Sequence, residues 1–326
     1  MDRRSKRALA VILALCVVLG GGYVVHAAFG PSRTTTDASP DAVASSVETP
    51  VMVRAVDPAN PNLNGGVFVV ADGKVRRRSK ELACERVYFA AGRGICMGVA
   101  ASGVDYGATV FDRRLRPEHS ISLTGLPSRA RVSADGRYGA MTVFVSGDAY
   151  LESSTAFSTR TYVLDMARGE TIGQLEQFEV LKDGARFDAA DFNFWGITFD
   201  PADSDRFYAT LGTGSHHYLV EGSVGARSMR VLRDGIECPS LSPDGSRIAF
   251  KSRTGEGRWR LHVLDLASLA DHPVAETRSI DDQAEWLDRD TLVYSDGTDV
   301  FVVDADGGGE PQLLVRDATS PVALRN

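Results

Sequence analysis

The sequence lacks the motifs that usually mark a catalytic or metal centre. Its 326 residues include only four cysteines, too few and too scattered for a tetrahedral zinc site. No G-x-S-x-G run occurs, and this absence removes the usual signature of a serine-hydrolase nucleophile. We therefore expect no bound metal, no cofactor and no catalytic residue.

Positive charge is scarce outside the first few residues. The chain carries a net charge of −7. The first seven residues hold four basic residues and one acid, so the remainder carries about −10. A domain of that charge does not attract nucleic acid or an anionic lipid surface through its net charge. No nucleic-acid partner is expected.

Long apolar runs are also rare, and the only prominent one lies near the N-terminus. The basic segment 1–7 precedes 23 uncharged residues at 8–30. About 20 apolar residues span a bilayer, whereas a signal-peptide core has roughly 7–15. This pattern favours a signal anchor in a bacterial plasma membrane, with 1–7 cytoplasmic and the rest outside. The alternative is cleavage after Ala27, which would give a secreted protein.

Residues 31–50 have no apolar period and are rich in Ser, Thr, Pro and Ala, which is typical of a disordered tether. The folded part is then expected at 51–326. Cys84 and Cys96 flank a hairpin-like stretch within it. Outside the cytoplasm they could form a disulfide, and the alternative is that they remain free thiols like Cys238.

One local pattern recurs along the folded part. In CPSLSPDGSRIAF at 238–250, two apolar runs flank a turn of small and acidic residues. The same succession occurs at 86–100, 130–144, 196–211 and 284–295. The turn positions are separated by 43, 66, 43 and 45 residues, and a period of this length is typical of propeller blades.

Each of these hairpins is followed by two more apolar segments, giving four short strands per unit. The segment 65–79 reads as third and fourth strands, and 320–326 reads as a first strand. With 51–56 as the second strand, they form a composite blade that closes the ring and leaves no open sheet edge. The sequence predicts six blades, with five as the nearest alternative.

The segments LSPDGSRIAF at 241–250 and VFVVDADGGGEPQLL at 300–314 are similar to the repeats of TolB-like six-bladed propellers. This resemblance implies an all-β fold of six four-stranded antiparallel blades, here following an N-terminal membrane helix. TolB itself carries an α/β domain before its propeller, and residues 31–65 are too few to form one.

The 66-residue step contains two insertions, at 146–159 and 182–194. One joins the second and third strands of a blade and the other joins that blade to the next, so both emerge on the face opposite the SPDG turns. Aromatic anchors among charges are typical of binding surfaces. The candidate binding residues are Tyr150, Glu152, Phe157, Phe187, Asp188, Asp191, Phe192, Phe194 and Trp195. Alternatively, the aromatic residues fold down and cap the propeller.

We expect a non-catalytic module that binds a protein or a component of the cell envelope. One alternative is a propeller hydrolase or lactonase with a metal in the central channel, and another is a purely structural propeller. A channel metal needs several acids at the starts of the first strands. Those starts are Arg86-Val87-Tyr88, Arg129-Ala130-Arg131, Trp195-Gly196-Ile197, Cys238-Pro239-Ser240 and Gln283-Ala284-Glu285, in which only Glu285 is acidic.

Overall fold

The computed structural model divides the chain into two compact units, residues 1–38 and 39–326. It describes residues 40–42, 47–57, 64–100, 102–145 and 158–325, all of which belong to the second unit. The predicted membrane segment 8–30 lies outside these residues. No helix among the residues that are described is long and apolar enough to cross a bilayer.

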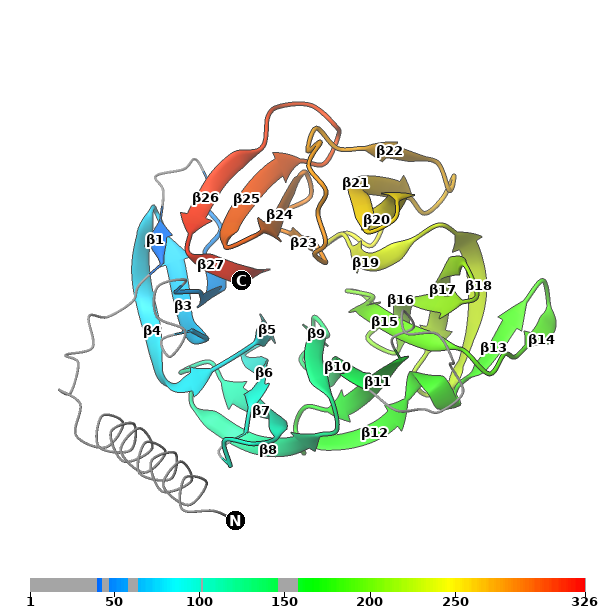
Figure 1. Ribbon diagram of the computed structural model, residues 1–326, viewed down its shortest axis with the longest axis horizontal. Helices are drawn as coiled ribbons and strands as arrows, with labels where there is room; N and C mark the ends of the chain where they lie inside the picture. Colours follow the sequence, from blue (N-terminus) through cyan, green and yellow to red (C-terminus); the bar gives the residue numbers. More distant parts are fainter. Residues whose placement is uncertain (1–39, 43–46, 58–63, 101, 146–157, 326) are drawn as a thin grey trace, which may run out of the picture. The chain divides into compact units, whose positions relative to one another are not determined.

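The second unit is an all-β propeller, as the sequence predicts. Six sheets stand around a common axis, and each contains a four-stranded antiparallel blade with its first strand innermost (Figure 1). Each blade has four strands in the order of the predicted pattern, and two blades gain additional strands at their outer edges.

The strands of each blade are given in order from the axis outward. The first blade is the composite one. It comprises β27 (Ala318–Ala323), β2 (Val51–Ala55), β3 (Gly66–Ala71) and β4 (Lys74–Ala83). The second comprises β5 (Arg86–Ala90), β6 (Arg93–Val99), β7 (Tyr106–Asp112) and β8 (Pro117–Leu123). The third comprises β9 (Leu126–Val132), β10 (Tyr138–Val145), β11 (Ser158–Asp165) and β12 (Glu170–Gln174), with a 3-10 helix, η2 (Leu175–Gln177), after it.

The other three blades follow in chain order. The fourth comprises β15 (Asn193–Phe199), β16 (Arg206–Thr213), β17 (His216–Ser223) and β18 (Ser228–Asp234). The fifth comprises β19 (Glu237–Leu241), β20 (Arg247–Gly255), β21 (Arg258–Asp265) and β22 (Asp271–Pro273). The sixth comprises β23 (Glu285–Trp286), β24 (Thr291–Asp296), β25 (Asp299–Asp304) and β26 (Gln312–Arg316).

The ring closes through the composite blade. Strand β27 pairs antiparallel with β2, so that Val51 lies opposite Ala323 and Met52 opposite Val322. This pairing satisfies the backbone groups on one side of β27 and joins the two ends of the propeller chain in one blade. The closure predicted from 51–56, 65–79 and 320–326 is therefore the one observed.

Two edge additions lie in segments that the sequence analysis treats as irregular. Residues 41–42 of the predicted tether form β1 (Asp41–Ala42), which pairs with β26. The folded unit thus begins before residue 51, because the outer edge of the sixth blade offers backbone groups to pair with. A hairpin, β13 (Glu179–Lys182) and β14 (Ala185–Phe187), overlaps the predicted insertion, and β13 runs parallel to β18.

The repeated SPDG turn has a clear physical basis. The Ser242 hydroxyl donates to Asp244 Oδ1 at 2.6 Å and accepts from the Arg247 backbone N–H at 3.0 Å. Ser133 contacts Asp135 at 2.7 Å and Tyr138 at 2.9 Å in the same way. The side chains thus hold the turn closed, which explains why Ser and Asp recur at these positions.

The apolar core lies between neighbouring blades. Ile95 from β6 and Met141 from β10, almost fully buried, belong to one cluster with Phe111 of β7. Trp286 and Tyr294 of the sixth blade similarly pack with Leu261 of the fifth. Because each blade buries its faces only against its neighbours, the complete ring is needed for the core. Cys84 and Cys96 form a disulfide near this core, with Cα atoms 5.2 Å apart.

The innermost strands share an irregularity near the axis. Gly196 in β15, Cys238 in β19 and Ser320 in β27 have φ values of 64°, 50° and 51°, and each lies where the pairing register shifts. At Gly196 the backbones also approach closely, because a Cβ there would lie 2.7 Å from the Cα of Cys238. Glycine is therefore required at 196 for both conformation and space.

We expect Gly196→Ala to lower the free energy of unfolding by at least about 2 kcal/mol, since it adds backbone strain and overpacking. The control is Gly214→Ala. Gly214 has a φ of 56° but no atom within 4 Å of the added methyl, so only the conformational cost of about 1–2 kcal/mol remains. Urea denaturation measures both, and equal losses would show that the contact with Cys238 is unimportant.

Candidate functional site

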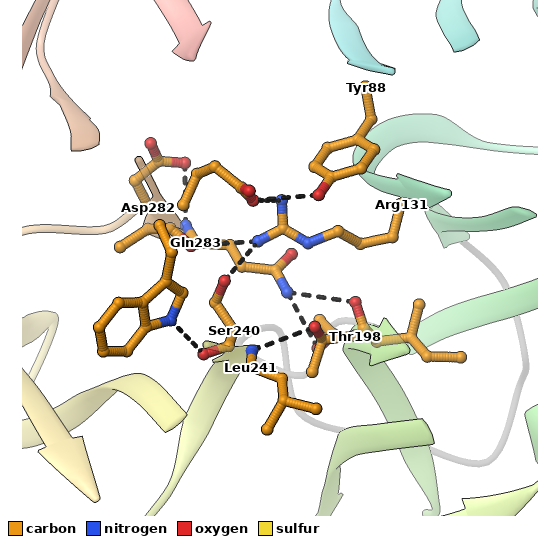
Figure 2. A network of polar contacts seen from close by, with 12 residues as sticks. Tyr88, Arg131, Thr198, Ser240, Leu241, Asp282 and Gln283 are labelled. Atoms are coloured by element: carbon orange, nitrogen blue, oxygen red, sulfur yellow. Dashed lines mark hydrogen bonds and ion pairs between the residues drawn. The ribbon is translucent and has the colours of Figure 1, made fainter. Parts of the chain in front are cut away.

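A buried ion pair joins two inner strands of the propeller near its axis. Arg131 of β9 and Glu285 of β23 lie 2.8 Å apart, with side chains only 6% and 3% exposed. The guanidinium of Arg131 also donates to Ser240 Oγ and to the carbonyl of Ala284, both at 3.1 Å (Figure 2). The charges of the pair and one Nη group of Arg131 are thereby matched, whereas Arg131 Nε is buried without an acceptor.

Two further side chains complete the environment of the Glu285 carboxylate. Arg325 donates to its Oε1 at 2.8 Å, and the Tyr88 hydroxyl donates to its Oε2 at 3.1 Å. The Tyr88 ring lies under the Arg131 guanidinium, 4.6 Å from ring centre to Cζ. Burial, together with the charge of Glu285, raises the pKa of Tyr88 to about 12, so this hydroxyl remains a donor.

Gln283 ties the inner strands of the fourth and fifth blades to the sixth. Its amide nitrogen donates to the carbonyls of Pro239 at 2.7 Å and Gly196 at 3.1 Å. Figure 2 shows Gln283 between Arg131 and Thr198, and the Thr198 hydroxyl accepts from the Leu241 N–H at 3.1 Å. We call Tyr88, Arg131, Ser240, Gln283, Glu285 and Arg325 the axis network. Beside it remains a hollow of only about 60 Å³.

The axis network bears on the channel-metal alternative. That alternative depends on Glu285, whose carboxylate accepts from two guanidiniums and one phenol. Within the described parts of the chain, no three His, Cys, Asp or Glu side chains gather in a way that could hold a metal ion. The charged side chains that contact Glu285, the acid predicted at the start of a first strand, are cationic.

A larger hollow of about 410 Å³ opens on one face of the ring, above the axis network. Strands alternate in direction within a blade, so the first strands all begin on this face, which also carries the two long connections. We call this hollow the mouth. Its walls come from inner strands and from the ends of β10, β20 and β21, and are formed by Arg86, Ser128, Arg129, Phe144, Trp195, Glu237, Cys238, Lys251, Arg253, Trp259 and Asp281.

Glu237 is an acidic residue of the mouth whose carboxylate already contacts three side chains. Its Oε1 accepts from the Trp259 indole N–H at 2.9 Å and lies 3.0 Å from His217 Nδ1 and 3.3 Å from Arg253 Nε. Burial by itself would raise its pKa, but the hydrogen bonds from His217 and Trp259 outweigh burial and lower it to about 2. Glu237 is therefore an anchor for Trp259.

Lys251 is the most deeply buried cation of the mouth, with its side chain 4% exposed. Its ammonium pairs with Asp281 and lies 4.5 Å from the centre of the Trp259 ring. Burial opposes its charge, but attraction to Cys238 and Asp281 outweighs burial and raises the pKa of Lys251. The Cys238 thiol, 2% exposed, is thus part of the same electrostatic cluster.

Arg86 and Arg129 share one backbone acceptor. Arg86 Nε donates to the Ser128 carbonyl at 2.7 Å, and Arg129 donates to it at 2.9 Å through Nη1. Burial lowers the pKa of Arg86, and the neighbouring charge of Arg129 lowers it further. Two like charges are therefore held close together in a partly desolvated position.

The candidate residues predicted from the insertions separate into two groups. Phe187, Phe192 and Phe194 pack together, with ring centres 5.0 and 6.0 Å apart, and Phe187 also contacts Tyr218. Phe194 is 1% exposed, whereas Phe187 and Phe192 are half-buried, and Phe192 lines the hollow at the start of β11 that is described below. Trp195 alone lines the mouth, beside His217.

The acids of these insertions have local roles. Asp191 accepts from the Thr213 hydroxyl and from the Gly214 N–H, both at 2.6 Å, and so holds the β16–β17 turn. Asp188 is exposed and lies 3.6 Å from Arg186. The remaining predicted residues, Tyr150, Glu152 and Phe157, lie outside the described residues.

A second hollow of about 400 Å³ lies where β11 begins, and Glu176 of η2 lines it. Both carboxylate oxygens of Glu176 accept from the Thr161 N–H, at 2.9 and 3.2 Å. Burial nevertheless dominates and raises the pKa of Glu176 to about 7.

Most residues of the mouth were not among the predicted site residues. Arg86 and Arg129 are visible in the sequence as basic starts of first strands. Lys251, Arg253 and Trp259 come instead from second and third strands of the fifth blade, and only the assembled ring brings them to the axis.

The fold resembles that of several solved structures. TolB from Acinetobacter baumannii has a TM-score of 0.62 at 15% identity, over 86% of this chain and 68% of that chain. A nidogen/laminin complex has a TM-score of 0.56 at 13% identity, over 84% of this chain and 97% of that chain. No protein-family model matches the sequence, and no curated protein is significantly similar to it. The fold is thus that of a TolB-like six-bladed propeller.

We expect Glu285→Gln to destabilise the protein by about 3–5 kcal/mol, because it leaves Arg131 buried without its counter-charge. The control is Asp188→Asn, which removes one partner of an exposed ion pair and should cost less than about 1 kcal/mol. Urea denaturation compares the two. A loss below 1 kcal/mol for Glu285→Gln would show that the buried pair is dispensable.

The pKa of Glu176 predicts a pH-dependent stability. The folded protein keeps this proton up to about pH 7, whereas an unperturbed glutamate releases it near 4.5. The folded state therefore binds more protons between these values, and this contribution to stability falls as the pH rises from 4.5 to 7. We expect Glu176→Gln to remove it, while the exposed Glu179→Gln does not. Unchanged slopes in a series of unfolding curves would contradict the raised pKa.

Proposed function

We propose that this chain is a membrane-tethered, extracytoplasmic propeller that binds a protein or cell-envelope component at its mouth without catalysing a reaction. The observation that carries the proposal is the mouth itself. It combines Trp195, Trp259 and the exposed Phe144 with arginine and lysine side chains in a hollow of about 410 Å³. Tryptophan and arginine are the residues that most often dominate binding energy at protein interfaces.

The axis network supports a binding site of fixed shape. Hydrogen bonds and the buried ion pair of the axis network join the third, fifth and sixth blades, so the inner strands that carry the mouth are held relative to one another. Rigid elements position contact groups more accurately than loops do. The inner strands supply Arg86, Arg129 and Trp195 in this way.

The fold is also compatible with a protein partner. The nidogen neighbour belongs to a structure that contains laminin, so the architecture is found in a protein that associates with another. A similarity at 13% identity supports the fold only. The partner of this chain must be identified by experiment.

Two features support a position outside the cytoplasm. Residues 1–30 have the basic and apolar pattern of a signal anchor. The Cys84–Cys96 disulfide is of the kind that persists in oxidising compartments. The attachment itself rests on the sequence pattern, and cleavage near Ala27 would place the same propeller in solution.

The test is recovery of a partner by the full-length chain from detergent-solubilised membranes. Arg253→Glu reverses a half-exposed charge at the mouth. Arg289→Glu makes the same change on the opposite face, in the β23–β24 turn, where the side chain is 72% exposed. We expect a partner that the wild type and Arg289→Glu recover and that Arg253→Glu loses. Equal recovery by both variants would exclude the mouth as the binding site.

A further inference from the structure

The mouth is positively charged although the protein is acidic. Four cationic side chains line it against two carboxylates, whereas the whole chain carries −7. The cations are Arg86, Arg129, Lys251 and Arg253, and the carboxylates are Glu237 and Asp281. A concave site lined by one sign of charge concentrates ligands of the opposite sign.

The two carboxylates do not neutralise all four cations. Glu237 forms an ion pair with Arg253, and it also contacts His217 and accepts a hydrogen bond from Trp259. Asp281 pairs closely with Lys251 and lies 4.0 Å from an Arg129 nitrogen. Among the described carboxylates, none forms an ion pair with Arg86. Asp282 and Glu85 attract its charge without such contact, but burial and the charge of Arg129 outweigh this attraction and lower the pKa of Arg86.

The arginines also offer hydrogen-bond donors. Arg129 Nε is buried and has no acceptor, although its side chain is 15% exposed and lines the mouth. Arg86 directs its Nε and Nη1 to backbone carbonyls at 2.7 and 2.9 Å. A buried donor without an acceptor is costly, so an acceptor supplied by a ligand would be favourable here.

We propose that the mouth binds a carboxylate of an acidic segment on a protein partner, held by Arg86, Arg129 and Lys251 between Trp195 and Trp259. This inference rests on the proposed function and names the chemistry of the partner. Guanidinium groups match the planar, two-oxygen geometry of a carboxylate and can bind it through two parallel hydrogen bonds.

The geometry favours a protruding acidic side chain over a lipid surface. Lys251 and Arg129 are only 4% and 15% exposed, so an anion must enter the mouth to reach them. The headgroups of a flat bilayer would contact the outer edge of the mouth before they could reach these two side chains. The domain outside residues 1–7 carries about −10 and would be repelled by an anionic membrane.

The protein contains its own probe of this site. Two of its three tryptophans, Trp195 and Trp259, line the mouth, and the third, Trp286, is fully buried elsewhere. Lys251 and Arg253 lie 4.5 and 5.7 Å from the Trp259 ring centre. A carboxylate that binds these cations therefore alters the surroundings of Trp259 and its fluorescence.

The experiment titrates the full-length chain in detergent with a short Glu/Asp-rich peptide, acetylated and amidated at its ends. Its partner is a Gln/Asn peptide of the same length. We expect a saturable fluorescence change with the acidic peptide only, and a weaker affinity as salt is raised. An equal response to the Gln/Asn peptide would overturn the proposal.

Two variants change the affinity in opposite directions. Arg86→Gln should weaken binding of the acidic peptide at least about tenfold, because it removes a charge-assisted contact. Asp281→Asn removes the competing carboxylate, whose side chain is 62% exposed, and should strengthen binding severalfold. Arg289→Gln on the opposite face is the control and should change nothing. Wild-type affinity in both mouth variants would overturn the proposal even if one of them were poorly folded.

Other ligands separate the sources of the anion. Succinate binding as tightly as the peptide would overturn the assignment to a protein segment, and a response confined to inorganic phosphate or phosphatidylglycerol vesicles would overturn the carboxylate. If Arg253→Glu loses the partner while Arg86→Gln keeps it with unchanged affinity, the carboxylate inference fails and the proposed function stands. If the acidic peptide binds but no partner is recovered, the proposed function fails instead.

Discussion

Arg131 of β9 and Glu285 of β23 form a buried ion pair, and these two strands lie on opposite sides of the ring (Figure 1). Removing two charges from water is costly, and hydrogen bonds to the remaining donors and acceptors help to offset the cost. Arg325, Tyr88 and Ser240 supply such bonds, and only Arg131 Nε among the nitrogens of that guanidinium is buried without an acceptor. Together with Gln283, these residues connect groups from all six blades near the axis.

The positive charge of the mouth is related to the contacts that Glu285 makes in the axis network. Because Glu285 is committed to two arginines below, it adds no free acid to the channel, and the hollow above is dominated by cations. Trp259 is held in place by Glu237, and Lys251 packs against its ring. The result is a recess with fixed walls and a local charge opposite to that of the whole chain, which suits recognition of an acidic group.

The repeat made most of the fold predictable, because Ser242 and Asp244 close their turn by local hydrogen bonds that short sequence patterns encode. The composite blade followed from counting strands. The hairpin β13–β14 was missed, because its pairing to β18 is parallel and distant in sequence. The mouth was missed for a similar reason. Convergence of Lys251 and Trp259 with Arg86 depends on the ring geometry, because these residues come from different blades and from different strands within them.

The central claim is that a fixed axis network supports a cationic mouth that binds a carboxylate. The most direct measurement is NMR detection of arginine Nε–H groups during titration with the acidic peptide. The account predicts shifts for Arg86 and Arg129, which line the mouth, and an unmoved signal for Arg131, which pairs with Glu285 and does not line the mouth. A shift of Arg131 equal to theirs, or no shift of Arg86 and Arg129, would contradict it.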